Sequence, residues 1–226
     1  MRWGIVQFPG SCDERDALHA CERTGAEARL LWHEERDLGG IDAVVVPGGF
    51  SYGDYLRAGA IARFSPAMEA VGEFAAAGGP VLGICNGFQV LCEAGLLPGA
   101  LLLNENLRFT CRQVDLVEES SIDAFAPEKG GQSIKPRLSI PAKHGEGRYY
   151  APGEVLDALE ANGQVAYRYA PGQNPNGSAR DIAGVRNEAG NVVGLMPHPE
   201  HAVDSLTGST DGLKIFETIA TARMSA

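Results

Sequence analysis

The sequence lacks the long apolar run that a membrane-spanning helix requires. No stretch of its 226 residues approaches the roughly 18 consecutive apolar residues of such a helix. The first ten residues, MRWGIVQFPG, also lack the basic start and apolar centre of a signal peptide. We therefore expect a soluble, cytoplasmic protein that makes no membrane contact.

Basic residues are scarce relative to acidic ones. The chain has 19 Lys and Arg against 29 Asp and Glu, which gives a formal net charge of −10, and no basic run interrupts this balance. Binding to a phosphate backbone requires clustered positive charge. The composition therefore argues against nucleic acid as a partner.

The cysteines lack the C-x-x-C spacing of zinc ribbons and dithiol redox sites, and their number is odd. They are Cys12, Cys21, Cys85, Cys92 and Cys111. We expect neither a disulfide framework nor a metal site, so in a reducing compartment one of these thiols can react. The phosphate-binding motif G-x-x-x-x-G-K-[ST] is also absent, which predicts no ATP site and no cofactor in this chain.

Short apolar runs alternate with amphipathic segments through the first hundred residues. The apolar runs predict strands at residues 3–8, 28–32, 41–46 and 81–84. Helices are predicted after a capping box formed by Ser11 and Glu14, and after the Ser65-Pro66 start signal. Continuous apolar strands separated by helices are typical of a parallel sheet covered on both faces. We predict an α/β fold with a doubly wound, mostly parallel sheet.

The second half of the chain has a different pattern. Between about residues 101 and 169 we expect short strands, at 112–117 and 138–140, joined by loops that include the polar segment 128–132. A strand at 192–196 and a helix at 211–222 follow. Since no repeat or linker divides the chain, we predict a single domain over residues 1–226.

Cys85 lies between a predicted buried strand and a predicted helix, in the segment VLGICNGFQ. The spacing G-x-C-x-G is that of a nucleophile elbow, in which flanking glycines permit a sharp turn. Such a turn places the sulfur at the carboxyl edge of the sheet and at a helix N-terminus, which favours a thiolate. The backbone N–H of Asn86 can then donate to an oxyanion. A buried structural cysteine is the alternative interpretation of Cys85.

A thiolate that transfers acyl groups needs a base, and the base needs a group to orient it. His198 and Glu200 follow the predicted strand at 192–196, so they share a sheet edge with Cys85. We expect the two prolines beside His198 to hold this loop extended and to direct both side chains to one side. His144 is the rival candidate for the base.

A second oxyanion donor is expected, because the loss of one such donor typically slows turnover by about 10²–10³-fold. Pro47-Gly48-Gly49 ends another predicted strand, and the amide of Gly49 has no side chain to obstruct a substrate. An ordinary tight turn explains the same three residues equally well.

Together these motifs resemble the class I (triad) glutamine amidotransferases, which combine a G-x-C-x-G elbow, an upstream Pro-Gly-Gly and a downstream His-Pro-Glu. Several segments resemble the members that serve purine biosynthesis: residues 45–60, 83–89, 106–109, 143–149 and 194–200. The resemblance implies the following roles: Cys85, His198 and Glu200 as the catalytic triad, Gly49 and Asn86 as the oxyanion hole, and Gln89, Arg108 and Phe109 as substrate contacts.

The resemblance also implies a reaction and partners. L-glutamine would be hydrolysed through a γ-glutamyl thioester, and the ammonia delivered to a separate ATP-dependent synthetase subunit that converts formylglycinamide ribonucleotide to its amidine. ATP and Mg are expected on that synthetase, and a small third subunit is expected to bridge the two. We expect low glutaminase activity without these partners.

The sequence departs from the family pattern at two positions. His201 stands where arginine is frequent, which alters a charge expected at the partner-facing rim, and Asn106 stands where serine is frequent. Two other classes of protein stay open. A cysteine peptidase or deglycase-like hydrolase can share the fold and the elbow, and a regulatory module could bind metal through His198, His201 and Cys85. Substrate specificity and metal analysis distinguish these classes.

Overall fold

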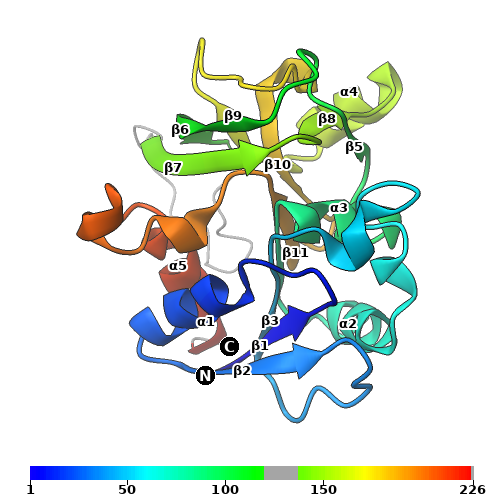
Figure 1. Cartoon of the computed structure of the whole chain (residues 1–226), viewed down its shortest axis with the longest axis vertical. Coiled ribbons are helices and arrows are strands. Elements are labelled where there is room, and N and C mark those ends of the chain that lie inside the picture. Colours follow the sequence, from blue (N-terminus) through cyan, green and yellow to red (C-terminus); the bar gives the residue numbers. More distant parts are fainter. Residues whose placement is uncertain (120–136, 225–226) are drawn as a thin grey trace.

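The computed structural model describes residues 1–119 and 137–224, so the predicted loop at 128–132 lies outside the described residues. A nine-stranded sheet in the order β2-β1-β3-β4-β11-β10-β9-β6-β7 runs through the molecule (Figure 1). The five parallel strands are β1 (Arg2–Gln7), β2 (Glu27–Trp32), β3 (Ala43–Val46), β4 (Val81–Ile84) and β11 (Val192–Leu195).

Four antiparallel strands extend this sheet beyond β11. They are β10 (Ile182–Arg186), β9 (Val165–Tyr169), β6 (Thr110–Glu118) and β7 (Arg137–His144). A separate two-stranded sheet pairs β5 (Ala100–Leu102) with β8 (Arg148–Tyr150). The change from parallel to antiparallel pairing coincides with the change of sequence pattern near residue 101.

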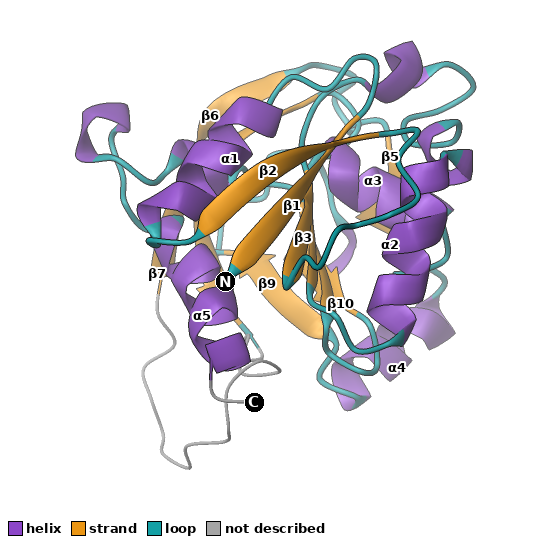
Figure 2. Cartoon of the chain, turned by 90° about the horizontal axis from the view of Figure 1, so that it is seen from below, coloured by secondary structure: helices purple, strands orange, loops and turns teal. Residues whose placement is uncertain are grey.

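Helices cover both faces of the parallel strands (Figure 2). One face carries α1 (Glu14–Arg23) and α5 (Leu213–Met224), and the other carries α2 (Pro66–Ala76) and α3 (Asn86–Glu93). A further helix, α4 (Gly153–Ala161), follows β8. Five 3₁₀ turns complete the described elements: η1 (Ser51–Asp54), η2 (Ala62–Phe64), η4 (Ala179–Asp181), η5 (Pro199–His201) and η6 (Ser205–Thr207). The structure confirms the predicted α/β fold.

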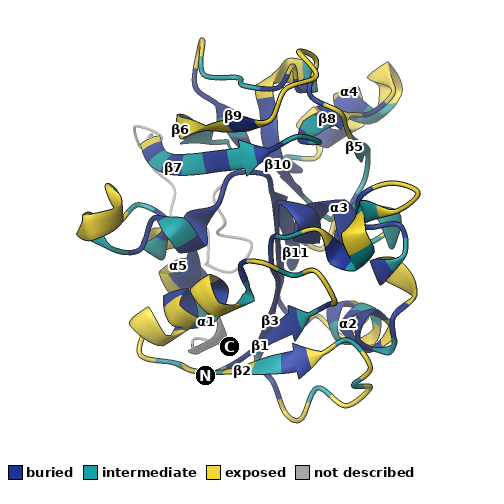
Figure 3. Ribbon diagram, in the orientation of Figure 1, coloured by how far each residue is buried: buried dark blue, intermediate teal, exposed yellow. Residues whose placement is uncertain are grey.

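The core lies where continuous apolar strands are sandwiched between helices. Every residue of β3, β4 and β11 is buried, whereas the outer faces of α1 and α4 are exposed (Figure 3). Trp3 of β1 packs edge-on against Phe216 of α5, with ring centroids 6.1 Å apart. In the described part of the chain, no helix combines the length and apolar character needed to cross a membrane.

One sequence prediction about helices is wrong, and one helix was missed. The capping box at α1 is absent, because the Ser11 hydroxyl accepts a hydrogen bond from the Phe8 amide and the helix begins at Glu14 with Asp13 as its N-cap. Helix α4 was not predicted, since Gly153 begins it without a polar capping side chain. The Ser65 cap of α2 is confirmed, because its side chain accepts from the Met68 amide.

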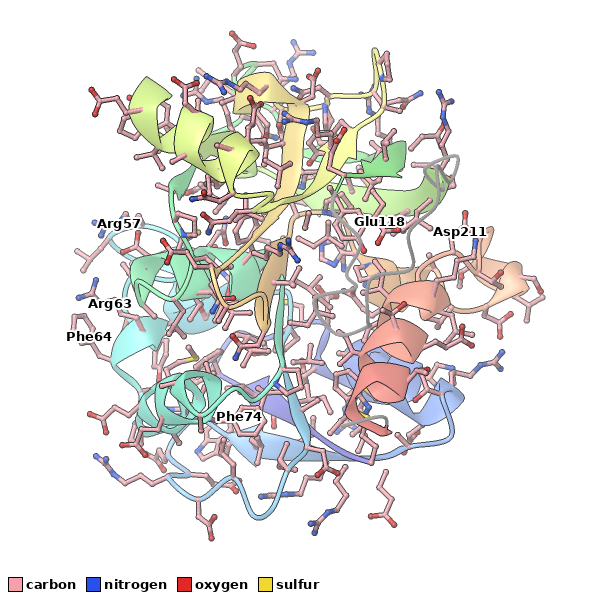
Figure 4. All side chains as sticks on the ribbon, turned by 180° about the vertical axis from the view of Figure 1, so that it is seen from behind. Arg57, Arg63, Phe64, Phe74, Glu118 and Asp211 are labelled. Carbon is pink, nitrogen blue, oxygen red and sulfur yellow. The ribbon has the colours of Figure 1, made fainter. Side chains whose placement is uncertain are left out.

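The loop after η1 is fastened to the end of α3. Arg57 makes two hydrogen bonds to the Glu93 carboxylate, of 2.6 and 2.5 Å, and Arg63 donates to the Glu93 backbone oxygen at 2.7 Å (Figure 4). The Arg63 guanidinium also lies over the Phe64 ring, 4.4 Å from its centroid. These contacts hold the segment that carries Asp54 beside the helix that begins after Cys85.

Candidate active site

Cys85 occupies a strained turn between β4 and α3. Its backbone angles, φ 51° and ψ −105°, are unfavourable for a non-glycine residue. A Cβ on Gly87 would lie 1.8 Å from the Val46 backbone oxygen, and one on Gly83 would lie 2.9 Å from Gly87. The structure therefore explains the G-x-C-x-G spacing, since both glycines allow the strand and helix to pack closely at the elbow.

His198 and Glu200 lie on the turn that follows β11. His198 Nδ1 and Glu200 Oε1 are 2.6 Å apart, and both side chains are buried. The prediction of an extended loop is wrong, because residues Pro199–His201 form the 3₁₀ turn η5. Proline fits the first position of a helical turn as well as an extended chain. The predicted pair is thus formed, although by a different backbone geometry.

Cys85 and His198 line one cavity of about 380 Å³, and Glu200 contacts His198 without lining that cavity. His198 Nε2 has no hydrogen-bond partner among the described residues, whereas its Nδ1 is held by Glu200. Burial opposes the charged imidazolium, but the negative charges of Glu200 and of a Cys85 thiolate raise the pKa of His198 to about 10. This environment favours the imidazolium form of His198.

His144, the rival base, is the last residue of β7 and is also buried. Its Nε2 lies 2.9 Å from the Asn176 side-chain amide, from which it can accept a hydrogen bond. Burial, with a smaller effect from the charge of His198, lowers the pKa of His144 to about 3. A neutral imidazole engaged in this way is a poor candidate for the base, so the geometry favours His198.

The amides of Gly49 and Asn86 border the same site. Gly49 lines the cavity with φ 151°, and a Cβ there would lie 2.7 Å from the Cys12 amide nitrogen. Asn86 is the first residue of α3, so its N–H has no partner within the helix. Among the described residues no hydrogen bond from either amide is seen. Both donors are therefore available to a ligand.

The three predicted substrate contacts have different positions. Gln89 is buried and lines the cavity, with its side-chain nitrogen 2.6 Å from the Glu146 backbone oxygen and its oxygen 2.9 Å from Asn86 Nδ2. Phe109 also lines the cavity, although its ring is half exposed. Arg108 is exposed and is not among the described residues that border the cavity.

Four charged residues that line the cavity were missed as functional candidates. They are Asp13, Asp54, Lys143 and Glu146. Asp13 follows the carboxyl end of β1, a position that could have indicated a role, but its sequence context is equally that of a helix cap. His201 Nε2 lies 3.2 Å from Asp13 Oδ1, so this departure from the family pattern faces the site.

Asp13, His198, Glu200 and His201 bring their ligand atoms within 4.8 Å of one another, a spacing that could hold a metal ion. The Lys143 ammonium already lies 2.5 Å from Asp13 Oδ1, where it supplies positive charge. The 2.6 Å contact between His198 and Glu200 is a hydrogen bond that a metal would have to break. Cys85 is not part of this cluster, so the set of His198, His201 and Cys85 named in the metal-binding alternative is not brought together as such.

We expect Asp54→Asn to stabilise the protein near neutral pH. Burial and the charge of Glu146 raise the pKa of Asp54 to about 6, against the opposing hydrogen bond from Asn86. The folded state therefore binds more protons than the unfolded state between pH 3.8 and about 6, and stability falls as the pH rises through that window. Removing the charge should add about 1 kcal/mol at pH 7.5, after allowance for solvent screening.

Denaturant unfolding at pH 3.5 and 7.5 measures this effect. The stabilisation should be present at pH 7.5 and absent at pH 3.5. The control Glu188→Gln, at an exposed position, should change the free energy of unfolding at neither pH. Equal stabilisation at both pH values would contradict the prediction.

The family described as "CobB/CobQ-like glutamine amidotransferase domain" matches residues 1–217. The phosphoribosylformylglycinamidine synthase subunit PurQ of Streptomyces avermitilis is 58% identical over 228 residues, covering 96% of each chain. The subunit of the same name from Thermus thermophilus is 56% identical over 223 residues, again covering 96% of each chain. This chain is therefore similar to these subunits over nearly its whole length.

Solved structures agree with these sequence comparisons. "Structure of PurLQS from Thermotoga maritima" contains a chain that matches with a TM-score of 0.86 and 42% identity, covering 97% of both chains. A protein from Thermoplasma acidophilum, described as a GMP synthase subunit, matches with a TM-score of 0.65 at 16% identity, which shows a shared fold alone.

Proposed function

The chain belongs to the CobB/CobQ-like glutamine amidotransferase family, and on this premise we propose that it is the glutaminase subunit of a phosphoribosylformylglycinamidine synthase. The observation that carries the proposal is that Cys85 and His198 line one cavity on the carboxyl edge of the sheet, with Glu200 held 2.6 Å from His198 Nδ1. The similarity to curated subunits of that enzyme supports the same assignment.

Cys85 acts as the nucleophile. Its thiolate attacks the side-chain amide carbon of L-glutamine, and the resulting oxyanion accepts hydrogen bonds from the Gly49 and Asn86 amides. His198 then protonates the amide nitrogen, so that ammonia leaves and a γ-glutamyl thioester remains. Water, deprotonated by His198, attacks this thioester to release glutamate and regenerate the thiolate.

Glu200 holds His198 in the orientation that this reaction needs. Its 2.6 Å contact with Nδ1 directs Nε2 away from the carboxylate and stabilises the imidazolium. Gln89 and Phe109 line the cavity and contact the bound glutamine. Arg108, which is exposed and does not border the cavity, acts on the substrate carboxylate at longer range.

The ammonia serves a second active site. We assign ATP and Mg, together with the conversion of formylglycinamide ribonucleotide to its amidine, to a separate synthetase subunit, with a small third subunit in the same cytoplasmic complex. The match to a chain of the PurLQS structure supports this arrangement.

Reconstitution tests the proposed function. We expect the purified chain to hydrolyse glutamine slowly, and faster by a factor of about 10 or more once the synthetase and small subunits are added, because binding of partners can order a catalytic site. The complex should form the amidine with either glutamine or ammonia as the nitrogen source. The synthetase without this chain should form it only with ammonia. Failure of this chain to confer glutamine-dependent synthesis would overturn the proposal, as would preferential hydrolysis of peptides.

A further inference from the structure

Asp13 is the N-cap residue of α1, but its side chain does not cap the helix. Within the described residues its carboxylate accepts no hydrogen bond from the first amides of α1, which is the usual use of aspartate at this position. The side chain is only 5% exposed, so a charged group has been buried where capping would have left it near solvent. This placement needs another explanation.

The carboxylate points instead towards the turn that carries His198. Figure 1 shows α1 beside the segment that follows β11. Asp13 Oδ2 lies 3.5 Å from His198 Nδ1, the nitrogen that Glu200 holds at 2.6 Å. His198 therefore faces two carboxylates, one from each end of the chain.

A lysine and a histidine contact the other oxygen of the Asp13 carboxylate. Asp13 Oδ1 lies 2.5 Å from Lys143 Nζ and 3.2 Å from His201 Nε2. Burial alone would raise the pKa of Asp13, but the hydrogen bond from His201, the charge of His198 and the contact with Lys143 hold it well below its usual range. Asp13 is therefore ionised throughout the working pH range of an enzyme.

Lys143 connects this cluster to the nucleophile. Its ammonium contacts Asp13, and its backbone oxygen lies 3.8 Å from the Cys85 sulfur. The positive charge of Lys143 thus neutralises the buried Asp13 carboxylate. The strand that carries Lys143, β7, also lies beside the Cys85 thiol. The titratable groups that face His198 are Cys85, Glu200, Asp13, His201 and His144. Lys143 acts on it through Asp13, whose carboxylate it contacts.

We propose that Asp13 is a positioning residue for the glutaminase reaction, which acts with Glu200 to orient His198 and to stabilise its imidazolium. The proposal rests on the function assigned above and adds a residue from the start of α1 to the groups that control the base. Lys143 moderates the effect, since its positive charge opposes an excessive stabilisation of the imidazolium.

Asp13→Asn in the assembled complex tests the proposal. Because one negative charge beside the imidazolium is lost, kcat for glutamine hydrolysis should fall about 10- to 100-fold with little change in KM. The alkaline limb of the pH profile, where His198 loses its proton, should move to lower pH by about one unit. Asp16→Asn, at an exposed position on the same helix, should leave both quantities unchanged.

Lys143→Gln provides an opposite test that does not depend on the folding of the first variant. Removing its positive charge should move the alkaline limb to higher pH. If the alkaline limb of the pH profile stays in place in Asp13→Asn, the positioning role is overturned. If Asp13→Asn does not fold, an unchanged alkaline limb in Lys143→Gln overturns it. Retention of glutamine-dependent synthesis by Cys85→Ala would instead overturn the proposed function, so the two failures are distinguishable.

Discussion

Replacing Cys85 with alanine should lower glutamine-dependent amidine synthesis by about 10⁴-fold or more, because the residual rate comes from binding and the oxyanion hole alone. Ammonia-dependent synthesis by the same complex should be unchanged, since ammonia bypasses the glutaminase. Steady-state assays with each nitrogen source, on the reconstituted complex, measure both rates. Alanine neither relieves nor adds to the backbone strain at this φ of 51°, so the fold should be retained.

Cys111→Ser is the matched control for the nucleophile. Cys111 is exposed on β6, where it pairs with Lys143 of β7, but it does not line the cavity. Both rates should equal those of the parent complex in this variant. Glutamine-dependent synthesis that survives in Cys85→Ala would exclude Cys85 as the nucleophile.

His198→Gln should reduce glutaminase kcat by at least about 10³-fold, since the reaction then lacks its proton donor and acceptor. Alkylation of Cys85 by iodoacetamide at neutral pH should also slow, because the thiolate loses its imidazolium partner. Because the pKa of His198 is raised to about 10, its imidazolium is present at neutral pH, where this effect should be seen. Alkylation rates measured as a function of pH therefore report the ion pair directly.

His19→Gln, on α1 and away from the cavity, controls for histidine loss in general and should change neither rate. His144→Gln tests the rival base. We expect it to retain more activity than His198→Gln, because the His144 Nε2 is already engaged by Asn176. The reverse order of the two variants would assign the base to His144.

The fold and the elbow could be predicted because local signals and tertiary structure agree there. The runs at 41–46 and 81–84 are apolar throughout most of their length, and the structure buries every residue of the strands formed there. Gly83 and Gly87 report a close approach of backbones that no larger residue permits. Apolar runs and required glycines can both be recognised from the sequence alone.

The surroundings of His198 could not be predicted in the same way. Asp13, Lys143 and His201 come from the start of α1, from β7 and from η5, and their contacts depend on how these elements pack. For Asp13 the sequence indicated no role, since the predicted capping box assigned the cap to Ser11, although aspartate commonly caps a helix at the position that Asp13 occupies. In the structure, pairing of Asp13 with Lys143, His201 and His198 replaces that capping contact.

The central claim is that Cys85 forms a covalent γ-glutamyl thioester. Acid quenching of the reconstituted complex during turnover of glutamine, followed by mass spectrometry of the intact chain and its peptides, tests it most directly. We predict one γ-glutamyl group on the peptide that contains Cys85, removable by hydroxylamine and absent from Cys85→Ala. A γ-glutamyl group on another residue, or turnover with no such group at any quench time, would contradict the claim.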